Sequence, residues 1–228
     1  MTKHFERETA KLKGHLLRLC ARVEDNVYRA ARALETRDAR LADEVIQSDA
    51  AVDEAEVDVE EECLKILALY QPVAIDLRFM VAVLKINNDL ERIGDLAVNI
   101  AERAMFLASR KDVQCPFDFT AMARKSQDML RKSIESMVNM DCSLARAVCA
   151  ADDAVDAMNR EMYGKVQDGI RRNIDHVSAL IHLLCASRHL ERIADLATNI
   201  AQDVIYMVEG EIVRHKTEDY GTARGRTE

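Results

Sequence analysis

Apolar residues recur every three or four positions through most of the chain. Between residues 83 and 104 they fall at Val83, Ile86, Leu90, Ile93, Ala97, Ile100 and Ala104. The same spacing returns at Leu183, Ala186, Leu190, Ile193, Ala197, Ile200 and Val204. This heptad-like seam is typical of long helices that pack side by side. Because proline and glycine are scarce, the pattern predicts helix almost throughout.

An internal repeat sets the architecture. Residues 90–101 read LERIGDLAVNIA and residues 190–201 read LERIADLATNIA, so ten of twelve positions are identical at an offset of 100. Upstream, Asp49-x-x-Val52-Asp53 matches Asp152-x-x-Val155-Asp156 at an offset of 103. A unit of about 100 residues is too long for a solenoid repeat and indicates a duplicated domain.

Each copy divides into three helical stretches. The first copy gives about 2–36, 38–70 and, after Gln71-Pro72, a stretch to about 111; the second gives about 119–140, 142–171 and 174–213. We therefore predict an all-α fold, a tandem pair of antiparallel three-helix bundles. The first bundle would span 1–111 and the second 119–216, with a linker at 112–118 and a disordered polar tail at 217–228.

Composition narrows the class of protein. The 228 residues carry a formal net charge of −8, whereas nucleic-acid binding requires a basic surface, so we expect no nucleic-acid partner. The charged start of the chain lacks the apolar region of a signal peptide, and no apolar stretch is long enough to span a bilayer, which favours a cytoplasmic protein. The six cysteines form no C-x-x-C pair, so reduced thiols are expected.

Carboxylates line up on one face of the predicted helices. Glu91, Asp95 and Asn99 follow each other at four-residue steps, as do Glu191, Asp195 and Asn199, and Asp49, Asp53, Asp152 and Asp156 offer a matching acidic edge. Like charges so spaced repel, and a cation between them would offset the repulsion. Such oxygen-rich stripes suit Mg²⁺, Ca²⁺ or Mn²⁺, and carboxylate clusters also hold iron. A solvated charged face, or an arginine–carboxylate pair that joins helices, is the alternative interpretation.

The repeated ERIxDLAxNIA, preceded by Gln71-Pro72 and Asp76-Leu77-Arg78, resembles the PhoU family of phosphate-transport regulators over about residues 1–215. This resemblance implies a metal ion cluster on each bundle, often iron, with Mg, Mn, Ca or Zn as alternatives. It assigns Glu91, Asp95, Glu191 and Asp195 as motif residues. The second copy departs from the first, because Arg188-His189 replaces Asn88-Asp89, so its site would hold fewer ions or none; His189 would be a nitrogen ligand or an ordinary hydrogen-bonded side chain.

The resemblance also implies a function. It predicts an adaptor between the ATPase subunit of a phosphate ABC transporter and a sensor histidine kinase, which represses the phosphate-starvation response when phosphate is plentiful. Such a protein would be a homodimer and would reach the membrane only through its partners. No P-loop or paired nucleophile and base is present, so we expect no catalysis. A carboxylate-cluster metalloenzyme or metal-storage protein, and a purely structural scaffold, are the alternatives.

Overall fold

The structure, a computed structural model, describes residues 3–110, 113 and 117–210. Within these ranges the chain forms helices and no strand, which confirms the predicted all-α class. The elements are α1 (Lys3–Thr36), α2 (Ala39–Tyr70), α3 (Ala74–Ala108), α4 (Phe119–Asn139), α5 (Cys142–Arg172), the 3-10 turn η1 (Ile174–His176) and α6 (Val177–Glu209). The predicted tail at 217–228 and most of the predicted linker at 112–118 lie outside the described residues.

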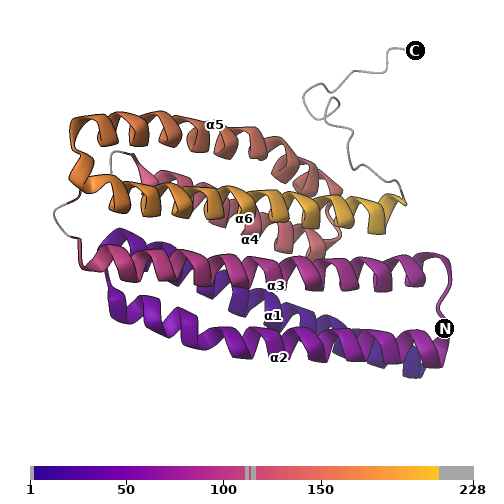
Figure 1. The fold of residues 1–228 in the computed structure, drawn as a ribbon. Coiled ribbons are helices and arrows are strands. Elements are labelled where there is room, and N and C mark those ends of the chain that lie inside the picture. Colours follow the sequence, from indigo (N-terminus) through magenta and orange to yellow (C-terminus); the bar gives the residue numbers. More distant parts are fainter. Residues whose placement is uncertain (1–2, 111–112, 114–116, 211–228) are drawn as a thin grey trace, which may run out of the picture.

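The helices are arranged as two bundles that lie against each other. Helices α1, α2 and α3 pack together, as do α4, α5 and α6. Figure 1 shows α3 and α6 side by side in the middle of the molecule and running in opposite directions, with α2 and α5 on the two outer sides. The predicted tandem pair of antiparallel three-helix bundles is therefore confirmed.

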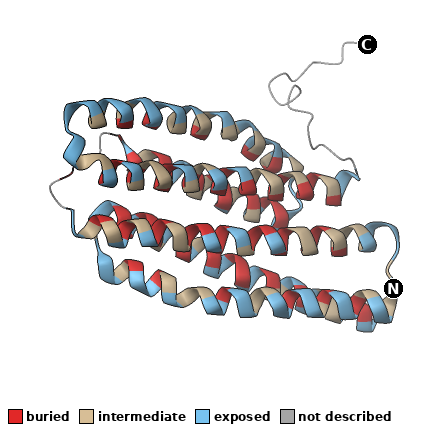
Figure 2. Cartoon of the chain, viewed as in Figure 1, coloured by how far each residue is buried: buried red, intermediate tan, exposed pale blue. Residues whose placement is uncertain are grey.

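The core follows the apolar seams read from the sequence. All seven seam positions of α3 and all seven of α6 are buried, and Leu90, Ile93, Leu190 and Ile193 are completely inaccessible to solvent. Figure 2 shows buried residues concentrated on the inward sides of the helices. Because α3 and α6 contact both their own bundle and the other one, they carry more buried positions than the outer helices. No helix of the described ranges has the length and apolar character needed to cross a membrane.

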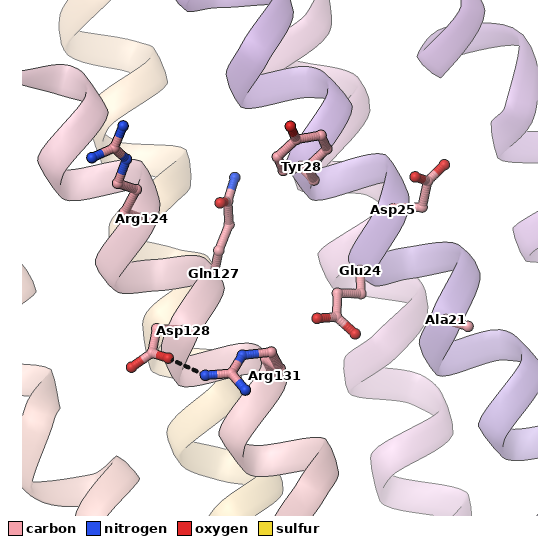
Figure 3. A pocket seen from close by; sticks show the side chains of 8 residues that line it. All are labelled: Ala21, Glu24, Asp25, Tyr28, Arg124, Gln127, Asp128 and Arg131. Carbon is pink, nitrogen blue, oxygen red and sulfur yellow. Dashed lines mark hydrogen bonds and ion pairs between the residues drawn. The ribbon is translucent and has the colours of Figure 1, made fainter.

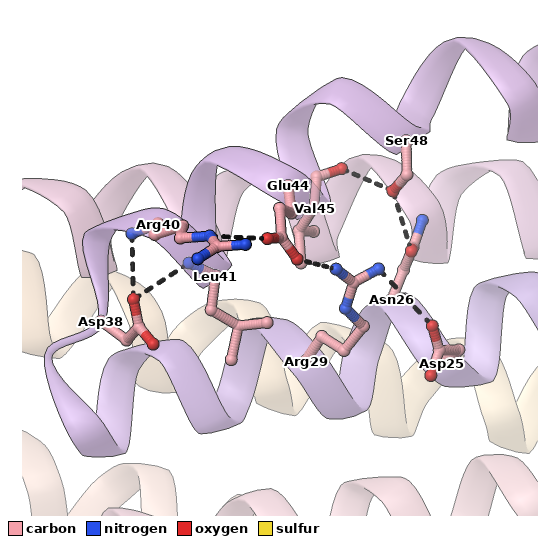
Figure 4. Close-up of polar contacts among 9 residues, drawn as sticks. All are labelled: Asp25, Asn26, Arg29, Asp38, Arg40, Leu41, Glu44, Val45 and Ser48. Carbon is pink, nitrogen blue, oxygen red and sulfur yellow. Dashed lines mark hydrogen bonds and ion pairs between the residues drawn. The ribbon is translucent and has the colours of Figure 1, made fainter.

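Equivalent aspartates start the middle helix of each bundle. The carboxylate of Asp38 accepts hydrogen bonds from the backbone N–H groups of Arg40 and Leu41 at 3.0 and 3.1 Å (Figure 4). Asp141 caps α5 in the same way at 2.9 and 3.0 Å. Free N–H groups at a helix start need such acceptors, so both copies turn from first to second helix at the same place in the repeat.

Polar contacts also cross between helices. In Figure 4, Arg29 of α1 joins Glu44 of α2, and the Ser48 hydroxyl donates to Asn26 Oδ1 at 2.9 Å. Between the bundles, Lys85 Nζ of α3 lies 3.3 Å from Asp203 Oδ1 of α6, and Asp203 is 1% exposed. A carboxylate buried to this extent requires charged or hydrogen-bonding partners, and Lys85 supplies one of them from the other bundle.

Candidate metal centre

The acidic residues of α2 face the acidic stripe of α3. The buried side of α2 presents Val45, Val52, Val59 and Ile66 at seven-residue steps. The carboxylates at positions 49, 53, 56 and 60 lie between these buried positions along the edge of the helix. The two helices come close here because α3 has a glycine at position 94: a Cβ on Gly94 would lie 3.1 Å from Val52 Cγ1 and 3.9 Å from Asp49 Oδ1.

The electrostatics of the first copy shows that these carboxylates share one region. The pKa of Asp49 is raised, first by desolvation and then by the charges of Asp53 and Asp95. The pKa of Glu91 is raised by desolvation and by the charges of Asp95, Glu56 and Asp53. Since these interactions join α2 to α3, the structure brings together the acidic residues that the sequence placed on separate helices. We call Asp49, Asp53, Glu56, Glu91 and Asp95 the first acidic cluster.

The second copy repeats the arrangement. Desolvation raises the pKa of Asp152 to about 6, and the charges of Asp195, Asp156, Asp153 and Glu191 add to the rise. Desolvation and neighbouring carboxylates also raise the pKa values of Glu191 and Asp195. The second acidic cluster consists of Asp152, Asp153, Asp156, Glu191 and Asp195.

Two oxygen atoms in these clusters have the environment that a cation would complete. Asp49 Oδ1 and Asp152 Oδ1 are buried and have no hydrogen-bond partner within the part of the chain that the structure describes. Buried acceptors are nearly always satisfied, so an unpaired atom at the same place in both copies requires a cause. Carboxylate oxygens alone form both clusters, and such oxygens are the ligands of hard cations and of carboxylate-bound iron. The residues present therefore fit the metal that the sequence predicts.

The side chains do not form a ready-made coordination shell. Among residues 3–110, 113 and 117–210, no three histidine, cysteine, aspartate or glutamate side chains converge closely enough to hold a metal ion. The amides are placed one turn further on: Asn99 and Asn199 are partly buried, and Asn99 Nδ2 donates to the Asp95 carbonyl at 2.8 Å.

Comparison with known proteins identifies the family. The family model described as "PhoU domain" matches residues 16–104 and 119–204. The chain belongs to the PhoU family. It is 36% identical over 210 residues to the Phosphate-specific transport system accessory protein PhoU homolog of Aquifex aeolicus, an alignment covering 92% of this chain and 95% of that protein. The corresponding protein of Thermotoga maritima, PhoU homolog 1, is 35% identical over 91% of this chain and 90% of its own length.

Solved structures of the family agree with this fold. The crystal structure of PhoU from Pseudomonas aeruginosa superposes with a TM-score of 0.87 at 33% identity and covers 91% of this chain and all of that one. PhoU from Streptococcus pneumoniae, described as a phosphate transport system regulatory protein, gives 0.81 at 27% identity over 92% and 99% of the two chains. The two PhoU matches to the family model each fall on one three-helix bundle.

The two PhoU copies differ at one polar pair beside the clusters. In the first copy, the buried Asn87 donates to Glu56 Oε1 at 2.8 Å and to the Glu56 carbonyl at 3.0 Å. At the equivalent place in the second copy, the Ser187 hydroxyl donates to Asn159 Oδ1 at 3.0 Å. In the second copy, the neutral amide of Asn159 therefore stands where the first cluster has the carboxylate of Glu56. Ser187 likewise stands where the first copy has the donor Asn87. Asn87 was not among the predicted site residues, although an amide within the apolar seam region of α3 was a signal that could have revealed it.

Two charged or ionisable side chains stand close to the motif carboxylates in the sequence, His189 and Arg92. Burial and then the charges of Arg103 of α3, Arg192 and Arg188 lower the pKa of His189 to about 4, so the imidazole is neutral at pH 7. Arg92 lies 3.7 Å from Asp89 on its own helix and makes no closer ion pair within the described chain. The motif carboxylate Glu91 is therefore not tied to its neighbouring arginine in a salt bridge.

Proposed function

We propose that this chain regulates phosphate uptake and phosphate-starvation signalling as an adaptor. It would contact the ATPase subunit of a phosphate ABC transporter and the cytoplasmic part of a sensor histidine kinase, and repress the response when phosphate is plentiful. The supporting observation is membership of the PhoU family over both bundles, with relatives named as accessory and regulatory proteins of phosphate transport. The protein would act without catalysis, by binding one state of its partner more tightly than another.

The location and assembly follow from the same proposal. The adaptor would be cytoplasmic, would reach the membrane only through its partners and would form a homodimer. A net charge of −8 supports the absence of a nucleic-acid partner, because it disfavours contact with phosphate backbones.

Co-purification tests the adaptor role. The full-length chain is captured from cells grown at high and low phosphate, together with tagged ATPase subunit and tagged kinase. We expect both to be retained, with retention that changes with phosphate supply. A chain that captures neither partner at any phosphate level, while folded by circular dichroism, contradicts the proposal.

We further propose that the two acidic clusters bind metal ions. Glu91, Asp95, Asp49 and Asp53 would hold cations in the first bundle, and Glu191, Asp195, Asp152 and Asp156 would do so in the second; Asn99 and Asn199 are candidate amide ligands. A bound cation would neutralise the clustered charge and hold the second helix of each bundle to the third. The unpaired oxygens of Asp49 and Asp152 support this proposal. Candidate metals are iron, Mg, Mn, Ca and Zn.

Thermal unfolding with and without metal tests this binding separately from any signalling assay. Added Mn²⁺ or Fe²⁺ should raise the midpoint of the chelator-treated protein, because a ligand that binds only the folded state stabilises it. Glu91→Gln with Asp95→Asn should remove the part of this rise that belongs to the first cluster. Glu61→Gln, on an exposed part of α2, is the matched control, and its unfolding midpoint should rise with metal as much as that of the wild type. An unchanged midpoint for the wild type at saturating metal would rule out the sites.

A further inference from the structure

A cleft lies between the bundles, and neither acidic cluster contributes to its lining. It has a volume of about 520 Å³ and is lined by α1 on one side and α4 on the other. Figure 3 shows Glu24 and Tyr28 of α1 facing the side on which Gln127 and Arg131 of α4 stand. Whereas α3 and α6 pack together along much of their length, α1 and α4 meet much less extensively. The cleft is the space that this divergence leaves open.

The register across the cleft is fixed by contacts along it. At one end the Thr120 hydroxyl donates to Glu35 Oε1 at 2.7 Å. Eleven residues further along each helix, Glu24 and Arg131 lie at the same level, and both line the cleft. The two helices are antiparallel, and continuing the register by seven residues places Leu17 at the level of Val138. Leu17 and Val138 are 39% and 53% exposed, so the open end of the cleft presents apolar side chains to solvent.

The two sides of the cleft carry opposite charge. The α4 side is lined by Arg124 and Arg131, with Asp128 as its one acid. Arg124 has no ion-pair partner among the residues that the structure describes, and Arg131 is paired with Asp128 at 2.6 Å on its own helix. The α1 side contributes Glu24 and Asp25.

We propose that this face binds a second copy of the chain, with a two-fold axis that runs along the cleft. Rotation about that axis places α1 of one copy on α4 of the other. Because the axis is parallel to the helices, each residue keeps its position along the helix direction. Glu24 then meets Arg131 of the second copy, and Leu17 meets its Val138, and each contact occurs twice, as in any isologous interface. An axis across the helices would instead stack α1 on α1 and α4 on α4, with like charges in contact.

A second copy fits this face better than an unrelated helix. The acidic α1 side of the cleft is the electrostatic complement of the basic α4 side. In a two-fold dimer the α1 side of each copy meets the α4 side of the other, so this complementarity is sufficient. The apolar residues supply burial: Leu17, Tyr28 and Val138 are all more than a third exposed in the single chain. The charged pairs at the rim select the register more than they add affinity. The inference rests on the homodimer proposed above and assigns its interface.

Mass measurement on charge-reversed chains tests the interface. Glu24→Arg and Arg131→Glu are purified separately, checked for folding by circular dichroism and thermal unfolding, and examined by sedimentation or light scattering. The wild type should show twice the chain mass of 25.7 kDa, and each variant alone the mass of one chain. Mixed in equal amounts, the two variants should again give the double mass, because arginine at 24 then meets glutamate at 131 across the axis. Within each variant chain the two positions still carry like charge, so a contact inside one chain cannot explain the recovery. The control variant Glu61→Arg should retain the mass of two chains.

The outcomes separate the interface from the dimer. A wild type that dimerises while both variants also dimerise refutes the α1–α4 interface and leaves the homodimer standing. Variants that are monomeric alone and remain so when mixed refute the two-fold register. A wild type that stays monomeric refutes both. Recovery of the double mass only on mixing is the result that the proposal requires.

Discussion

Replacement of Asp152 by asparagine should stabilise the metal-free protein. The Asp152 carboxyl stands among four other carboxylates, and its pKa is raised from 3.8 to about 6, chiefly by desolvation and then by Asp195 and Asp156. A rise of that size corresponds to about 3 kcal/mol for a fully buried group. Because Asp152 is only partly buried, solvent screening reduces the expected gain to about 1–2 kcal/mol. Asparagine keeps the shape of the side chain and removes its charge.

The gain should depend on pH in a defined direction. The folded-state pKa of Asp152 lies above its unfolded value, so the ionised group destabilises the folded chain. Its favourable contribution is fully present below about pH 4 and is lost as pH rises through about 6. The free energies of unfolding of wild type and Asp152→Asn should therefore coincide near pH 4 and separate by about 1–2 kcal/mol above pH 7.

Urea unfolding of chelator-treated protein, followed by circular dichroism at several pH values, measures this difference. Asp153→Asn is the matched control, because it removes the same charge from an exposed neighbouring position and should give a smaller change. With Mn²⁺ present the order should reverse, since the variant loses a ligand. A variant that is less stable than the wild type at pH 7 without metal would refute the view that Asp152 is held in an unfavourable charged cluster.

Three further predictions concern the framework and the first cluster. Asp38→Ala should cost about 1 kcal/mol in urea unfolding, because α2 loses its cap, whereas the exposed Asp43→Ala in the same helix should cost little. Lys85→Met removes an ammonium from the buried Asp203 carboxylate and should cost about 1–3 kcal/mol by thermal unfolding; adding Asp203→Asn should recover part of that loss. Asn87→Ala frees the Glu56 carboxylate and should weaken Mn²⁺ binding by the first cluster in calorimetry, with the second cluster as internal control.

The fold was largely predictable because its signals are local and repeated. The seam from Val83 to Ala104 specifies which side of α3 is buried, and the identical spacing in α6 does the same. The predicted start of the second helix at about residue 38 agrees with α2, which begins at Ala39 after the cap at Asp38. The start of α6 was placed at 174, where the structure has a 3-10 turn, since Asn173 accepts from the Asp175 N–H and delays the helix to Val177.

The clusters were predictable only in part. Periodicity placed Glu91 and Asp95 on one stripe of α3, but it could not say that Asp49 lies opposite them, because that depends on how closely α2 approaches Gly94. The role of His189 was also open, since it depends on Arg103, which belongs to the other bundle. The cleft between α1 and α4 could not be predicted at all, because no sequence pattern records the angle at which two bundles meet.

Metal content of the protein purified without chelators from its own host tests the central claim most directly. Elemental analysis is compared between the wild type and a variant carrying Glu91→Gln, Asp95→Asn, Glu191→Gln and Asp195→Asn, with both proteins shown to be folded. We expect stoichiometric metal in the wild type and its loss in the variant. A metal-free wild type, or a variant that retains the full metal content, would contradict the assignment of the paired acidic clusters as metal sites.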